Sequence, residues 1–152
     1  MIPKFRAWHE QGFMLREENI VKLNLEEEKL EYCVLNEDGV RSDRECSFYE
    51  VKLMQSTGLF DKNDKEIFEG DIIYIFQKGV ISRNLEAHDE NRKVVFFEGS
   101  WCVENYADTG ENFGNFIIEN HYPIGLYHTK DELEVIGNIY ENPELLEVEN
   151  EY

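Results

Sequence analysis

Apolar and polar residues alternate with a period of two through much of this sequence, and short turn-prone stretches interrupt the alternation. Residues 21–25 alternate valine and leucine with polar residues, and residues 30–34 resume the pattern after a charged stretch. A β-strand places successive side chains on opposite faces, whereas an α-helix repeats every 3.6 residues. Because the helical period is scarce, the chain is predicted to be mainly β, an antiparallel barrel or sandwich of short strands.

Turn signals mark where the predicted strands reverse direction. Asp38-Gly39 is a strong turn signal because both residue types tolerate a positive φ angle, and residues 61–65 form a second polar turn. Near the C-terminus, residues 135–140 are predicted to be a closing strand. Pro143 suits the first turn of a helix, so a short C-terminal helix is predicted to follow that strand.

The length of 152 residues predicts one domain with a single core, spanning residues 1–152. Residues 1–50, rich in hairpin-like units, form a candidate N-terminal subregion of that domain. Residues 86–93 and 107–114 are polar and are predicted to be exposed loops, and the tail at 147–152 is predicted to fray.

Acidic residues dominate the charge, and the formal net charge is -18. Residues 94–152 hold 13 acidic residues and a single basic residue, Lys130. Nucleic-acid backbones and anionic membranes are bound by basic surfaces, so direct binding to either is not expected. The charge favours solubility, or alternatively an acidic surface that imitates nucleic acid.

Cysteine content and the N-terminal sequence predict the compartment. Cys33, Cys46 and Cys102 form an odd set without metal-ligand spacing, which argues against a disulfide framework and against a zinc site. The first residues lack the apolar core of a signal peptide, and no apolar run reaches the roughly 20 residues that span a bilayer. A reducing cytoplasm fits these features.

The segment from Gly58 to Ile75 is the natural place to test for calcium binding. Its polar loop begins with Asp61 and Asn63, but glutamate stands where an EF-hand loop needs glycine, and Ile72 stands where it needs a bidentate glutamate. The segment is therefore predicted to be a hairpin turn leading into a strand. No metal site is expected there.

Candidate catalytic groups are weakly specified by this sequence. Glu69 and Asp71 flank Gly70 and could form an acid/base pair, but proximity is expected by chance among 33 carboxylates. Cys102 lies in an alternating strand and is predicted to pack in the core rather than to act with His121. We therefore expect no catalytic residues, no cofactor and no enzymatic activity.

Three segments resemble the YopX-type proteins of phages and prophages of Gram-positive bacteria. They are "KFRAWHEQGFM" near the N-terminus, "LMQSTGLFDKNDKEIFEGDII" in the middle, and "VIGNIYENPELL" near the C-terminus. Their order and spacing cover nearly the whole chain. The resemblance implies a small, mostly β protein without known catalytic residues, and it implies that assembly into oligomers would not be surprising.

Within those segments we single out eight residues as a structural signature. Glycines there are expected to serve special backbone angles or close strand approach, and aromatic residues are expected to pack. The signature residues are Phe5, Trp8, Gly58, Gly70, Asp71, Gly137, Tyr140 and Pro143.

The resemblance predicts an accessory protein in the cytoplasm of a bacterial host. It would act by binding, as a homo-oligomer or on a host protein, with contacts on the loops at 86–93 and 107–114. The first alternative is an acidic mimic of nucleic acid that sequesters a host DNA-binding protein. The second is an enzyme that uses carboxylates near Glu69 and Asp71.

Overall fold

A computed structural model describes residues 2–76, 90–105, 120–124 and 129–146. The chain divides into two compact units, Met1–Ser56 and Thr57–Tyr152. Strand β6 begins in the first unit and ends in the second.

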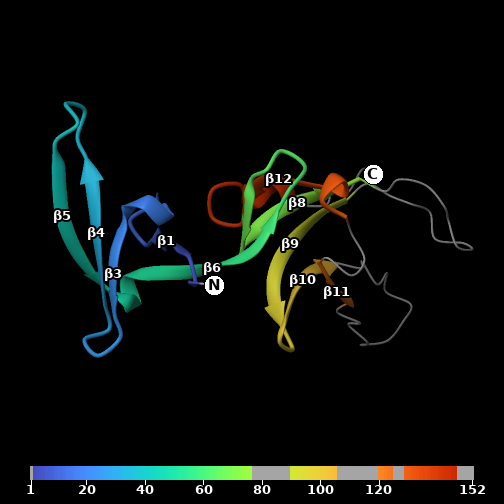
Figure 1. Cartoon of the computed structure of the whole chain (residues 1–152), viewed down its shortest axis with the longest axis horizontal. Helices are drawn as coiled ribbons and strands as arrows, with labels where there is room; N and C mark the ends of the chain where they lie inside the picture. Colours follow the sequence, from blue (N-terminus) through green and yellow to red (C-terminus); the bar gives the residue numbers. More distant parts are fainter. Residues whose placement is uncertain (1, 77–89, 106–119, 125–128, 147–152) are drawn as a thin grey trace, which may run out of the picture. The chain divides into compact units, whose positions relative to one another are not determined.

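The first unit contains five strands and the start of a sixth (Figure 1). Two short 3-10 turns, η1 (Glu17–Asn19) and η2 (Phe48–Glu50), connect parts of it. The strands are β1 (Phe5–His9), β2 (Phe13–Leu15), β3 (Ile20–Asn24), β4 (Lys29–Leu35), β5 (Arg41–Ser47) and β6 (Val51–Phe60).

Two antiparallel arrangements build this unit. Strands β3, β4 and β5 form one sheet in that order, and β1 pairs with both β2 and β6. Alternation along β4 places Leu30 and Tyr32 in the core and Glu31 on the opposite face. The buried core is made of Ala7, Leu15, Leu30, Tyr32, Cys46 and Val51.

The second unit is built on a five-stranded antiparallel sheet in the order β11-β10-β9-β8-β12, which curls as a half-barrel (Figure 1). Its strands are β8 (Asp71–Ile75), β9 (Glu90–Phe97), β10 (Ser100–Asn105), β11 (Asn120–Pro123) and β12 (Leu133–Asn138). The short strand β7 (Glu66–Phe68) neighbours β6. The 3-10 turns are η3 (Lys130–Glu132) and η4 (Pro143–Leu146).

Buried aliphatic side chains from β7, β8, β9, β10 and β12 make up most of the core of this unit. The core comprises Ile67, Ile73, Ile75, Val94, Val103, Ile124, Leu133 and Val135.

The hairpin between β9 and β10 turns at Glu98-Gly99, where both residues have positive φ angles of 46° and 81°.

The prediction of a mainly β, antiparallel chain is confirmed, and the prediction of a C-terminal helix is wrong. Residues Pro143–Leu146 form a single 3-10 turn, and no α-helix occurs in the part of the chain that the structure describes. Proline does start this turn, as expected. A segment of four residues forms too few backbone hydrogen bonds to offset the cost of nucleating an α-helix.

Several predicted boundaries also differ from the structure. Residues 90–93, expected in a loop, belong to β9, and the closing strand expected at residues 135–140 is β12 at Leu133–Asn138. The other half of that loop, the loop at 107–114 and the tail at 147–152 lie outside the described residues. The turn at Asp38-Gly39 is confirmed, with a φ of 76° at Gly39.

Among the helices of the described residues, none is long and apolar enough to cross a membrane.

Candidate functional site

Asp61 lies in the polar turn directly after β6, within the segment from Gly58 to Ile75. Its side chain is fully buried. Oδ1 accepts hydrogen bonds from the backbone N–H groups of Asn63 at 2.8 Å and Lys65 at 2.9 Å, and Oδ2 accepts one from Val135 at 2.9 Å. The carboxylate therefore joins the turn after β6 to strand β12, a structural task.

The pKa of Asp61 reflects two opposing effects. Burial alone would raise the pKa, because a low-dielectric environment disfavours the charged form. The backbone donors of Val135, Lys65 and Asn63, helped by the positive charge of Lys65, outweigh burial and hold the pKa below its ordinary value. The group is thus kept ionised as an acceptor for the backbone.

Gly70 and Asp71 form the bend between β7 and β8. Gly70 has a φ of 80°, its N–H donates to Val94 O at 2.9 Å, and its carbonyl accepts from Ile139 N at 2.9 Å. Asp71 is buried, and its Oδ2 accepts from Phe68 N at 2.8 Å. The bend thereby contacts both β9 and the segment after β12.

The C-terminal signature residues meet this bend through the pairing of β8 with β12. Asp71 lies opposite Asn138, and Ile72 lies opposite Gly137, next to a bulge in β12. Asn138 Oδ1 accepts from Tyr140 N at 3.0 Å and from Glu141 N at 2.9 Å, which tightens the turn that follows. A Cβ added at Gly137 would lie 2.5 Å from Asn142 Oδ1, so glycine is required by close approach.

The remaining signature residues have separate places in the fold. Phe5 and Trp8 are half-buried on β1, opposite Gln55 and Lys52 of β6. Gly58 lies within β6 with a φ of 74°. Pro143 starts η4 and is exposed. The structure thus brings Gly70, Asp71, Gly137 and Tyr140 into one corner of the second unit, and places the other four elsewhere.

The thiols and metal-binding side chains show no assembled reactive centre within the described ranges. Burial raises the pKa of the Cys46 and Cys102 thiols, which disfavours the reactive thiolate. No group of three His, Cys, Asp or Glu residues that could hold a metal ion is found in that part of the chain. The backbone of His121 on β11 pairs with Glu104 on β10, two residues from Cys102 on that strand.

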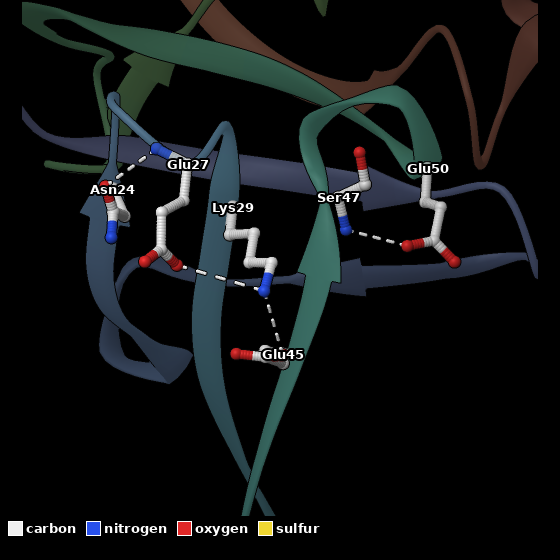
Figure 2. A network of polar contacts seen from close by, with 6 residues as sticks. All are labelled: Asn24, Glu27, Lys29, Glu45, Ser47 and Glu50. Atoms are coloured by element: carbon white, nitrogen blue, oxygen red, sulfur yellow. Dashed lines mark hydrogen bonds and ion pairs between the residues drawn. The ribbon is translucent and has the colours of Figure 1, made fainter.

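The three-stranded sheet of the first unit carries a network of exposed charges at one end (Figure 2). Lys29 Nζ lies 3.8 Å from Glu27 Oε2 and 3.4 Å from Glu45 Oε1, and so links β4 to β5. Close by, Ser47 N donates to Glu50 Oε2 at 2.7 Å, which closes the η2 turn. Bonds between exposed charged groups contribute little to stability.

An open groove of about 300 Å³ lies on the same sheet. It is lined by charged residues of both signs and one tyrosine from β4 and β5, together with one valine of β3. The lining residues are Val21, Glu31, Tyr32, Arg41, Asp43, Arg44 and Glu45.

Strand β5 is an edge strand of this sheet among the described residues, and its exposed edge is the feature that the sequence did not reveal. The five residues Arg41 to Glu45 are exposed one after another. Exposed apolar side chains accompany it in the first unit, with Leu35 at 66% and Val40 at 58%. The signal in the sequence was a run of five polar residues, Arg41 to Glu45, that begins shortly after the turn at Asp38-Gly39.

Comparisons with known proteins agree with this architecture. The family model described as YopX protein matches residues 4–147. The chain is similar to protein EF1440 from Enterococcus faecalis, with a TM-score of 0.57 and 25% identity over 97% of this chain and 99% of that chain. It shares the fold of the yopX protein from Bacillus subtilis, with a TM-score of 0.56 and 21% identity over 95% and 98% of the two chains. Among curated proteins no match was found.

Proposed function

This chain belongs to the YopX protein family, and on that premise we propose that it is a phage or prophage accessory protein that acts by binding or assembly. In this proposal the protein is a homo-oligomer in the cytoplasm of the bacterial host. It uses no cofactor, carries out no reaction, and binds neither nucleic acid nor membrane directly.

The observation that carries the proposal is the exposed edge of β5. A strand at the edge of a sheet offers a row of backbone donors and acceptors to another strand. Here the side chains of Arg41, Asp43 and Glu45 are 56%, 73% and 59% exposed. This edge supports a function in which the protein pairs with another polypeptide.

The acidic residues near Gly70 support structural roles instead of catalysis. Asp71 is buried and accepts a backbone hydrogen bond from Phe68, and Asp61 accepts three such bonds. A carboxylate that holds the backbone in this way is poorly placed to exchange protons with a substrate. We therefore do not propose catalysis by Glu69 and Asp71.

A host protein remains a second class of partner, with residues 86–93 and 107–114 as the proposed contact regions. Affinity capture tests the two classes together. The full chain with one tag is expressed beside a copy with a second tag in lysogenic cells, and the first tag is used for capture. Recovery of the second copy in stoichiometric amount is expected. Recovery of neither the second copy nor any stoichiometric host protein would contradict a binding function.

The acidic mimic of nucleic acid is a second candidate, and the charge asymmetry favours it. Residues 94–152 hold 13 acids and only Lys130. A mimic would capture a basic DNA-binding protein at low salt and release it as salt screens the charges. Capture that is unchanged at high ionic strength would count against this candidate.

A further inference from the structure

The backbone of β5 alternates between groups that bond to β4 and groups that point away from it. At the two ends of this ladder, Asn36 N donates to Val40 O at 3.0 Å and Phe48 N donates to Glu28 O at 2.8 Å. Hydrogen-bonded pairs alternate along an antiparallel ladder. The even-numbered residues of β5 therefore bond to β4, and the N–H and C=O groups of Arg41, Asp43 and Glu45 point outward.

No other strand pairs with this outward edge within the residues that the structure describes. The side chains of its three outward-bonding residues also share one face, where Arg41 Nε lies 2.7 Å from Asp43 Oδ1. Charged side chains on an edge strand oppose indiscriminate pairing with other chains. They permit pairing only with a strand whose charges are complementary.

Among symmetric registers centred on one of its exposed residues, Arg41 to Glu45, the sequence of β5 is complementary to itself in one. In a two-fold antiparallel pair, the residue on the axis lies opposite its own copy. An axis through Arg41, Asp43, Arg44 or Glu45 would set like charges directly opposite each other, which is destabilising. An axis through Ser42 sets two hydroxyl groups opposite each other and sets Arg41 opposite Asp43 of the second copy, twice.

We propose that two copies of this chain join by antiparallel pairing of their β5 strands, with Ser42 on the two-fold axis. The outward backbone groups of Arg41 and Asp43 then bond to those of the second copy, and the two three-stranded sheets become one continuous sheet. This inference rests on the proposed function and specifies its partner. Such a pairing buries less than the roughly 1,600 Å² of a standard stable interface, so association is expected to depend on concentration.

Cysteine cross-linking tests the register. On the axis, Ser42 and its copy form a pair that is not hydrogen-bonded, with Cα atoms about 4.5 Å apart, which suits a disulfide. Arg44 is the matched control because it is exposed and lies on the same face of β5. Its two copies would be separated by roughly four residues of strand, about 13 Å, which is too far for a disulfide.

The full chain is used, with Cys33→Ser as the background because Cys33 is the one native thiol that is not buried. Ser42→Cys, Asp43→Cys and Arg44→Cys are each oxidised in a glutathione buffer and run on a non-reducing gel. Circular dichroism confirms that every variant folds like the background chain. We expect Ser42→Cys to give at least about tenfold more covalent dimer than Arg44→Cys, given the distance limits of a disulfide.

The other outcomes separate the inference from the proposed function. Preferential cross-linking of Asp43→Cys, or equal cross-linking of all three variants, would overturn the Ser42 register. Absence of cross-linking while the unmodified chain has a solution mass above 18.0 kDa would overturn pairing through β5 and leave self-assembly in place. Absence of cross-linking together with a mass of 18.0 kDa at all concentrations would overturn both.

Discussion

At the scale of single residues, Asp61 is the clearest case of a charged side chain with a structural role. One buried carboxylate accepts three backbone hydrogen bonds, one of them from Val135, 74 positions away in the sequence. In the sequence, Asp61 is a candidate calcium ligand in a loop that fails the EF-hand pattern. Its structural role could not be predicted, because the partner strand β12 is distant in the chain.

Replacing Asp61 with asparagine should lower the free energy of unfolding by about 1–3 kcal/mol, since the amide offers one acceptor oxygen where the carboxylate uses two. Urea unfolding at pH 7 measures the loss. Asp131→Asn is the control because it removes one carboxylate from an exposed position. An equal effect of both substitutions would contradict the role of Asp61.

The same residue predicts a pH dependence. Because the folded pKa is lowered, the unfolded chain binds the proton more tightly. The stabilisation from Asp61 is therefore fully present above the unfolded pKa of about 3.9 and is lost as the pH falls through the lower folded value. The stability difference between wild type and Asp61→Asn should shrink below about pH 4. A constant difference from pH 7 to pH 3 would contradict this account.

Gly137 gives a prediction of a different kind, based on space. Gly137→Ala should destabilise the protein by about 1–3 kcal/mol, the usual cost of overpacking, because the new Cβ would lie 2.5 Å from Asn142 Oδ1. In an Asn142→Gly background the whole side chain that the new Cβ would meet is gone, so the same substitution should cost less. Thermal unfolding of the four chains of this cycle measures the coupling, and strict additivity would contradict the proposed contact.

At the scale of strands and turns, the sequence predicted those elements whose own residues carry the pattern. Strand β4 was predictable because Leu30 and Tyr32 alternate with polar residues and face a core. The turn at Asp38-Gly39 indicated that a strand follows, but the exposed edge of β5 was not predictable, because its exposed residues carry no apolar alternation and its conformation comes from pairing with β4. The prediction of a helix after Asn142 was wrong, because a proline at the start of a helix does not specify how far the helix continues.

The charges of β5 predict a specific pattern of loss and rescue. Asp43→Arg should weaken self-association, because in the Ser42 register it places arginine opposite Arg41 of the second copy. The swap Arg41→Asp with Asp43→Arg restores opposite charges in the same register and should restore association. Sedimentation equilibrium of the three chains measures the effect. Equal weakening by the single and double substitutions would contradict the register.

At the scale of the whole molecule, the net charge of -18 dominates. Mutual repulsion of so many carboxylates destabilises a compact state, and salt screens it over about 10 Å at 0.1 M. The midpoint of thermal unfolding should therefore rise as NaCl is added from low ionic strength. A non-ionic solute at the same osmolality is the control. A midpoint that stays constant or falls with NaCl would contradict this expectation.

The central claim is that this chain acts by pairing with a second copy of itself, and its mass in solution tests that claim most directly. Light scattering is measured at protein concentrations up to about 1 mM, where even a complex with a millimolar Kd is partly populated. The account predicts a mass that rises above the 18.0 kDa of one chain as the concentration increases. A mass that stays at 18.0 kDa across the whole range would contradict it.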